Sequence, residues 1–253
     1  MQRRACLGLL LQGAALAFAH PALAATGLSV AAAESFRKPL TALAERYRKE
    51  GGEAVSFVFG ASSMLAEKVA GGGIDLVFCA RSWADRMAKD DKLQDGTRAD
   101  FLGDHLVLIA PAPHAPVALD PAALVQALKG GKLALAEPGK TQTGDYAKSA
   151  LVSLGLWDGV AGSLLPGENV RAAVASVRDG HAPLGIAYQT DVHGLGAVAV
   201  VAAFPDSSHP PIAYSLALTR GADPAAAKFL SFLQSAQARA AYVEAGFALT
   251  GSR

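Results

Sequence analysis

Apolar and polar positions follow two different periods along this chain, and the two periods alternate. Short apolar runs bounded by turn residues are typical of buried strands, whereas an apolar position every three to four residues indicates the inner face of a helix. The runs of the first kind predict these strands: Leu28–Ala32, Ala54–Phe59, Ile74–Cys79, His105–Ala110, Leu133–Ala136, Leu184–Ala187, Val198–Ala203 and Ile212–Leu218.

The segments between these strands predict helices. Leu40, Leu43 and Tyr47 fall on one stripe, and Asp120 followed by Pro121 is a typical helix start. The predicted helices are 36–49, Met64–Ala70, Ser82–Ala88, one opened by Asp120, Asp145–Leu154, one from Asn169 to Val177, and Ala225–Ala245. Strands that alternate with helices in this way predict an α/β fold with mostly parallel sheets.

The first 24 residues predict a secretory signal peptide. Arg3 and Arg4 precede an apolar run from Ala5 to Ala19, and Ala22-Leu23-Ala24 fits the small-x-small cleavage pattern. Cleavage before Ala25 leaves about 229 residues for the exported protein. A membrane anchor is the alternative, but the apolar run is short for a bilayer.

Charge and cysteine content narrow the class of protein. The whole chain carries a net charge of +1, which becomes about −1 without Arg3 and Arg4, so a nucleic-acid partner or an anionic membrane surface is not expected. Cys79 is the one cysteine beyond the signal peptide. It ends an apolar strand, which indicates a buried, unreactive thiol.

Two serine-bearing turns each connect a predicted strand to a predicted helix. They are Ala33-Glu34-Ser35 and Gly60-Ala61-Ser62-Ser63. Helix N-termini leave backbone N–H groups free and carry partial positive charge, so two such turns indicate a socket for a small anion. The same serines could instead be ordinary helix caps.

Several short motifs occur in an order that resembles a known family. They are Val30-Ala31-Ala32-Ala33-Glu34-Ser35, Phe59-Gly60-Ala61-Ser62-Ser63, Gly144-Asp145-Tyr146-Ala147-Lys148, Glu168-Asn169-Val170-Arg171 and Ala182-Pro183-Leu184-Gly185-Ile186-Ala187-Tyr188. Together they resemble the periplasmic molybdate-binding proteins of ABC transporters. The resemblance spans residues 27–249.

The resemblance implies a type II periplasmic-binding-protein fold with two lobes and a hinge. Lobe one is expected to contain 25–106 plus 193–253, and lobe two 107–192. It further implies a monomer in the periplasm that binds molybdate or tungstate between the lobes and delivers it to a membrane permease. No cofactor, no metal coordinated directly by the protein and no catalysis are implied.

The same resemblance assigns five ligand-binding positions in this chain. They are the hydroxyls of Ser35, Ser62 and Tyr188 and the backbone N–H groups of Thr143 and Val170. Such a set suits molybdate, because a fully deprotonated dianion offers only acceptors and therefore needs only donors. A protonated phosphate would also need an acceptor, and an unpaired buried donor costs about 1–3 kcal/mol.

This chain departs from the family pattern at three places near the expected site. Gln142-Thr143 replaces the usual Pro-Ala, Ala61 replaces a serine, and Glu34 replaces an alanine. Glu34 and Asp145 would repel a dianion if they pointed inward; the alternative is that both face solvent and favour their helix N-termini.

Two other functions remain open on the sequence alone. Gln142-Thr143 and Glu34 allow a binding protein for another oxyanion or a small organic acid. A serine hydrolase is a remote alternative, because the chain contains no Gly-x-Ser-x-Gly motif and its histidines lack metal-ligand spacing.

Overall fold

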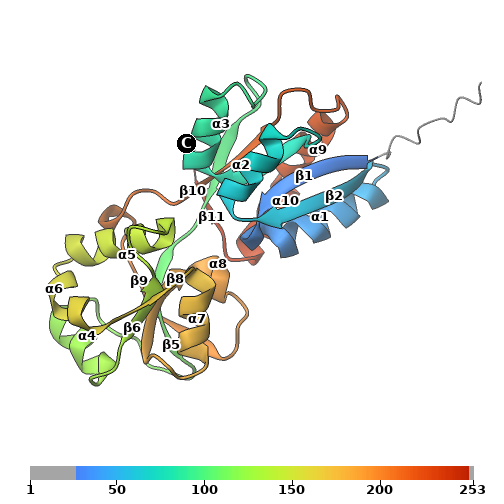
Figure 1. Ribbon diagram of the computed structural model, residues 1–253. Coiled ribbons are helices and arrows are strands. Elements are labelled where there is room, and N and C mark those ends of the chain that lie inside the picture. Colours follow the sequence, from blue (N-terminus) through green and yellow to red (C-terminus); the bar gives the residue numbers. More distant parts are fainter. Residues whose placement is uncertain (1–26, 251–253) are drawn as a thin grey trace, which may run out of the picture.

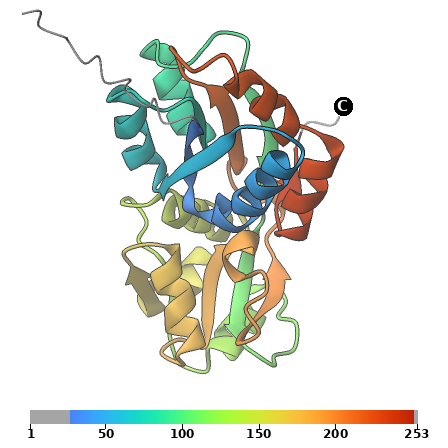
Figure 2. The same cartoon turned by 90° about the vertical axis from the view of Figure 1, so that its right-hand side faces the viewer.

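The computed structural model describes residues 27–250, which form two lobes connected by a narrow waist (Figures 1 and 2). The predicted signal peptide lies outside these residues. None of the helices within 27–250 has the length and apolar character needed to cross a membrane.

The first lobe contains a six-stranded sheet in the order β11-β4-β10-β3-β1-β2. Strands β1, β2 and β3 run parallel, whereas β10 lies antiparallel to β3 and β4, and β11 lies antiparallel to β4. The strand bounds are β1 Gly27–Ala33, β2 Ala54–Gly60, β3 Leu76–Ala80, β4 Ala99–Gly103, β10 Ala213–Leu218 and β11 Ala248–Leu249.

Helices cover both faces of this sheet (Figure 1). One group packs together as α1, α9 and α10, and the other as α2 and α3. A short 3-10 turn, η1, precedes α1. The bounds are η1 Glu34–Phe36, α1 Arg37–Lys49, α2 Ser62–Ala70, α3 Arg81–Lys89, α9 Ala226–Leu233 and α10 Ala236–Glu244.

The second lobe contains a five-stranded sheet in the order β7-β6-β8-β5-β9. Strand β6 is parallel to β7 and β8, whereas β5 is antiparallel to β8 and β9. The strands are β5 Leu106–Pro111, β6 Leu133–Ala136, β7 Leu164–Gly167, β8 Leu184–Tyr188 and β9 Val198–Ala203. The helices are α4 Pro121–Leu128, α5 Gln142–Ser153, α6 Trp157–Val160, α7 Val170–Arg178 and α8 Gln189–Val192, with 3-10 turns η2 Ala161–Ser163 and η3 Asp206–Ser208.

The α/β architecture with two lobes confirms the predicted fold class, but the sheets are mixed rather than mostly parallel. The first strand after each crossing between the lobes runs antiparallel to its neighbour: β5 to β8 in the second lobe, and β10 to β3 in the first. The predicted helix Ala225–Ala245 is two helices, because the Ser235 side chain accepts a hydrogen bond from the Ala238 N–H at 3.2 Å and caps α10. Strands β4, β7 and β11 were not predicted; β7 contains Pro166 and lies at a sheet edge, where proline is tolerated.

Sheet membership also differs from the expected division of the chain. Residues 193–253 were assigned to the first lobe, yet β9 pairs with β5 in the second sheet. The chain therefore returns to the first sheet only after Ala203, through the segment that leads to β10. Strand β9 hydrogen-bonds to the side of the buried strand β5 that faces away from β8, and it forms the edge of the second sheet.

Two connections cross the waist side by side. The first joins β4 to β5, and His105 within it lies 3.2 Å from Asp206 of the second connection, between Nδ1 and Oδ1. Asp104 is buried and accepts hydrogen bonds from the His105 N–H at 2.9 Å and the Thr190 hydroxyl at 2.5 Å. Burial raises the pKa of Asp104 to about 8 despite these donors.

An aromatic cluster fixes the first serine turn to the core of the first lobe. The fully buried ring of Phe36 stacks on Phe78 at 4.0 Å and on Phe247 at 4.3 Å, and the Tyr214 ring meets it edge-on at 4.9 Å. Phe36 directly follows Ser35, so the packing of this ring holds the serine in place. Cys79 is buried in the same lobe, and burial raises the pKa of its thiol to about 12, as expected for an unreactive cysteine.

Candidate functional site

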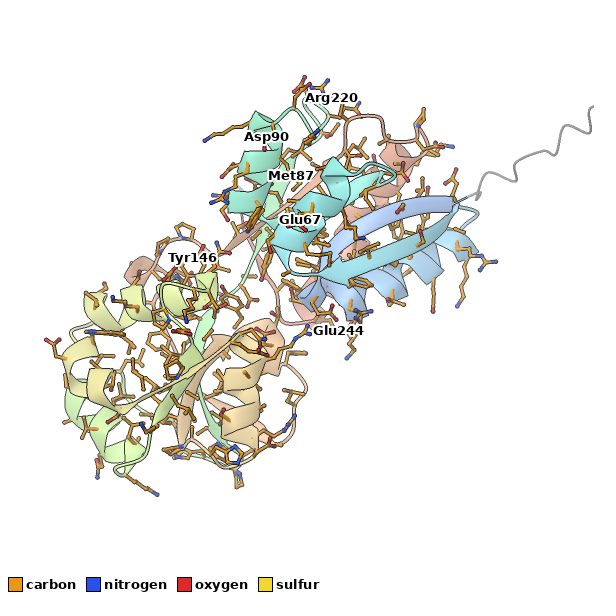
Figure 3. The ribbon with its side chains drawn as sticks, viewed as in Figure 1. Glu67, Met87, Asp90, Tyr146, Arg220 and Glu244 are labelled. Atoms are coloured by element: carbon orange, nitrogen blue, oxygen red, sulfur yellow. The ribbon has the colours of Figure 1, made fainter. Side chains whose placement is uncertain are left out.

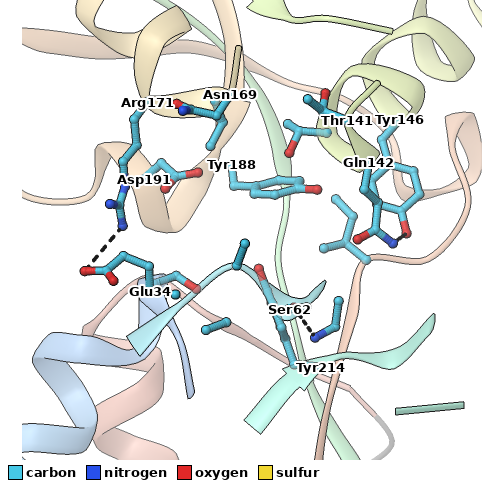
Figure 4. Close-up of a pocket in the computed structure, with 18 of the residues that line it drawn as sticks. Glu34, Ser62, Thr141, Gln142, Tyr146, Asn169, Arg171, Tyr188, Asp191 and Tyr214 are labelled. Atoms are coloured by element: carbon cyan, nitrogen blue, oxygen red, sulfur yellow. Dashed lines mark hydrogen bonds and ion pairs between the residues drawn. The ribbon is translucent and has the colours of Figure 1, made fainter. Parts of the chain in front are cut away.

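A cleft of about 340 Å³ lies between the two lobes. Figure 4 shows side chains from both lobes turned toward this space, with Tyr188 on one side and Tyr214 and Ser62 on the other. Its lining residues come from η1, the start of α2, the starts of α5 and α7, the end of β8 and the start of β10.

Strand register brings the two serine turns together. In the parallel pair β1 and β2, Ala33 lies opposite Gly60, so the turns that follow both strands leave the sheet at one edge. Ser35 and Ser62 are the second residues beyond those two positions, and both line the cleft. Ligands of α/β proteins bind at this carboxyl edge of parallel strands.

The second lobe repeats this arrangement with helix starts instead of serine turns. Ala136 of β6 lies opposite Gly167 of β7, so the loops that lead to α5 and α7 also leave the sheet together. Thr143 and Val170 sit in the first turns of these helices and line the cleft. Tyr188 ends the neighbouring strand β8 and completes this wall.

In the second lobe, capping side chains bind some of the N–H groups at the helix starts and leave others available to a ligand. The Thr141 side chain caps α5 by accepting from the Gly144 N–H at 3.0 Å, and the Asn169 side chain caps α7 by accepting from the Ala172 N–H at 3.0 Å. The N–H groups of Thr143 and Val170 have no acceptor among residues 27–250. Free N–H groups at helix starts are donors for an anion.

The serines of the first lobe are not helix caps, which settles the alternative left by the sequence. The N-cap residues are Ala61 for α2 and Ala33 for η1, and neither makes a capping hydrogen bond through its side chain. Instead, the Ser62 hydroxyl oxygen accepts from the Ala80 N–H at 3.1 Å, at the end of the adjacent strand β3. The Ser62 hydroxyl donates no hydrogen bond to any residue within 27–250, so its proton is available to a ligand.

Two tyrosines contribute hydroxyls to the same cleft. Tyr188 comes from the second lobe and Tyr214 from the first, and both line the cleft. Burial raises the pKa of both phenols above their ordinary values, so both remain protonated donors near neutral pH.

The five residues predicted from the sequence therefore line one cleft: Ser35, Ser62, Thr143, Val170 and Tyr188. Their contact with a ligand stays a prediction. Tyr214 and Asp191 also line the cleft and were not predicted. Tyr214 lies at the start of an antiparallel strand, whereas the predicted sites lie beyond the carboxyl ends of strands. Asp191 lies in the first turn of α8, three residues after Tyr188, and its closeness to this motif was the signal that could have indicated it.

The acidic residues near the site behave differently from one another. Asp145 lies outside the cleft lining, and its carboxylate accepts from the Gly139 N–H at 2.7 Å. Glu34 lines the cleft, but Arg37 donates to it at 2.5 and 2.9 Å, and Arg171 of the other lobe lies 3.7 Å away. The hydrogen bond from Arg37 holds the pKa of Glu34 below its usual range, although burial opposes this.

Asp191 is a second carboxylate in the wall of the cleft, on the side of the second lobe. Burial raises the pKa of Asp191 to about 6, and the Arg171 guanidinium opposes this rise. Arg171 therefore faces two acidic side chains, Glu34 across the cleft and Asp191 in its own lobe. Within residues 27–250, no three His, Cys, Asp or Glu side chains form a group that could hold a metal ion.

This fold and this site belong to a class of proteins that enclose a solute between two lobes. The family model of bacterial extracellular solute-binding proteins matches residues 28–248, so the chain belongs to this family.

Two relatives are similar along nearly their whole length. The molybdate-binding protein ModA of Escherichia coli is 36% identical over 249 residues, which cover 95% of this chain and 97% of the relative. The protein of the same name from Haemophilus influenzae is 36% identical over 245 residues, which cover 94% and 95%. These matches confirm the resemblance inferred from the motifs and favour binding over the hydrolase alternative.

A solved structure supports the same fold. The periplasmic molybdate-binding protein of Azotobacter vinelandii superposes with a TM-score of 0.71 at 23% identity, over 88% of this chain and 99% of that one. At this identity the likeness establishes the architecture.

Proposed function

We propose that this protein binds molybdate between its lobes in the periplasm and delivers it to the permease of an ABC importer. The observation that carries this proposal is the set of hydrogen-bond donors from both lobes that line the cleft. Three hydroxyls of Ser35, Ser62 and Tyr188 and two N–H groups of Thr143 and Val170 face one space. The names of the two curated relatives support molybdate as the ligand.

Donors alone suit a dianion that has lost all its protons. Each oxygen of molybdate accepts hydrogen bonds, and fixed dipoles of α5 and α7 can stabilise its charge without a buried counter-ion. Hydrogen bonds to a charged group contribute about 1.5–3 kcal/mol each. We include tungstate as a second ligand, because it has the same shape, charge and acceptors.

The carboxylate of Asp191 favours one second candidate, a partly protonated oxyanion such as hydrogen phosphate. Such a ligand would donate its proton to Asp191, and its other oxygens would accept from the same donors. A small organic acid would use the donors in the same way.

Binding between lobes predicts closure. A ligand that contacts both lobes stabilises the arrangement in which they approach, and the permease would recognise that arrangement of a monomeric binding protein.

A thermal-shift panel tests the ligand. Molybdate, tungstate, sulfate, phosphate and chromate are added separately, and a ligand that binds the folded state raises the melting temperature by mass action. We expect the largest shifts with molybdate and tungstate. A shift with phosphate or an organic acid and none with molybdate would replace the first candidate by the second.

A further inference from the structure

Two polar contacts join the lobes on opposite sides of Tyr188. On one side, Glu34 of η1 lies 3.7 Å from Arg171 of α7. On the other, the Gln142 side-chain amide of α5 donates to the Ser82 hydroxyl of α3 at 3.4 Å. Figure 4 shows Glu34 with Arg171 at one end of the cleft and Gln142 at the other. We call these two contacts the clasps.

Each clasp lies directly beside groups that line the cleft. Glu34 precedes Ser35 and Arg171 follows Val170, so the first clasp connects the neighbours of one donor from each lobe. Gln142 precedes Thr143, and it also donates to the Tyr146 hydroxyl at 2.8 Å, which fixes its amide (Figure 3 shows Tyr146 on the side of the second lobe that faces the first). Any movement that separates the clasps therefore separates the donor groups.

The first clasp is held in place from the side of the first lobe. Arg37 donates two hydrogen bonds to the Glu34 carboxylate, and its guanidinium lies 4.4 Å from the centre of the Phe59 ring. Glu34 thus meets Arg171 as a fixed, ionised carboxylate.

The first clasp also forms a wall of the cleft. Glu34 and Arg171 line both the cleft and a second groove that runs outward between α1 and α7. Ser35 and Asp191 also line both spaces, so the first clasp lies where the cleft and the groove adjoin.

We propose that the clasps Glu34–Arg171 and Gln142–Ser82 hold the lobes together around the ligand and slow its release. The lobe contact stands on this structure alone, whereas the effect on ligand release rests on the proposed function. Glu34 and Gln142 are also positions at which this chain departs from the family pattern, so the clasps are features of this chain rather than of the resemblance.

The lobe contact is tested first without ligand. Spin labels on E67C of α2 and V152C of α5, both exposed positions on different lobes, report the inter-lobe distance in the chain from Ala25 onward, in which the buried Cys79 is the one native cysteine. We expect E34Q and R171Q to increase the population at longer distances, and Q142A to do so less. R178Q is the matched control, because Arg178 also lies on α7 but pairs with Asp179 of its own lobe. Distances in E34Q and R171Q that equal those in R178Q would overturn the proposal.

Ligand release is tested next by the dissociation rate of molybdate from the same variants. A partly exposed ion pair changes an equilibrium by up to about fivefold, so we expect E34Q to accelerate release by about two- to fivefold. R171Q should accelerate it more, because Asp191 also loses its cation. In the R171Q background, E34Q should cause no further acceleration. Multiplied effects in the double variant would show that the two side chains act separately and would contradict the clasp.

The two experiments separate the two proposals. If the unaltered protein binds no molybdate but E34Q still lengthens the inter-lobe distance, the ligand assignment fails and the clasp stands. If molybdate binds and E34Q changes neither distance nor release, the clasp fails and the ligand assignment stands.

Discussion

The two lobes offer the same kind of hydrogen-bond donor by different means. The first lobe presents the hydroxyls of Ser35 and Ser62, on turns whose N-cap residues are alanines, and the hydroxyl of Tyr214 at the start of β10. The second lobe presents one hydroxyl, that of Tyr188, and two backbone N–H groups, those of Thr143 and Val170, at helices that have side-chain caps.

This difference decides which substitutions each lobe tolerates. A hydroxyl disappears when its side chain is replaced, whereas a backbone N–H survives every replacement except proline. The first lobe should therefore be sensitive to side-chain identity at the cleft, and the second lobe to helix geometry. Anchoring differs as well: aromatic packing holds the Ser35 turn, and a cap holds the start of α7.

The largest effect should come from the anchor of the first lobe. Phe36→Ala removes a fully buried ring that stacks on two others, which should lower the free energy of unfolding by about 3–5 kcal/mol. Asn169→Ala removes the cap of α7 and should cost about 1 kcal/mol. Urea unfolding of both variants measures the difference, and equal losses would show that packing and capping anchor the two walls equally.

The next effect concerns a single hydroxyl of the first lobe. Ser62→Ala removes a donor to the ligand and leaves the Ala80 N–H without its acceptor. We expect affinity for molybdate to fall by about 1.5–3 kcal/mol, measured by calorimetry. Ser63→Ala is the control, because Ser63 is exposed next to it and does not line the cleft. An equal loss of molybdate affinity in both variants would show that the Ser62 hydroxyl does not bind the ligand.

Two of the first-lobe donors, Ser35 and Ser62, could be predicted from the sequence because a hydroxyl donor is identified by its residue type. The turns around Ser35 and Ser62 follow recognisable strands, and the parallel register of β1 and β2 then places them together. Thr143 and Val170 depended on the family resemblance, since a backbone N–H leaves no mark on residue type. The contact between Glu34 and Arg171 could not be predicted, because it joins residues of different lobes that only the tertiary structure brings together.

The strand directions were also beyond the sequence pattern. A buried parallel strand and a buried antiparallel strand can have the same kind of continuous apolar sequence. The apolar pattern of β5, β9 and β10 therefore did not reveal their direction. This also explains why β9 was assigned to the first lobe and why Tyr214, at the start of β10, was missed.

The backbone donors of the second lobe can be tested at Val170, the first residue of α7. Val170→Pro removes the N–H and should leave α7 intact, because proline is tolerated at a first helical position and Asn169 before it is already extended. Affinity for molybdate should fall by about 1.5 kcal/mol or more, whereas Val170→Ala, which keeps the N–H, should bind nearly normally. Circular dichroism shows whether α7 persists, and equal affinities of the two variants would exclude this N–H as a donor.

The smallest effect concerns Asp191, the carboxylate that interrupts the donor set of the second lobe. Its pKa is raised to about 6 by burial, so it is largely neutral at pH 5 and ionised at pH 7. Because an ionised carboxylate repels a dianion, affinity for molybdate should weaken between pH 5 and pH 7, by about fivefold or less for a partly exposed group. Asp191→Asn should bind more tightly at pH 7 and lose this dependence on pH. Calorimetry at both pH values measures the affinity of each protein for molybdate. A ligand that donates a proton to Asp191 would instead bind the Asp191→Asn variant more weakly, and this result would favour a protonated oxyanion.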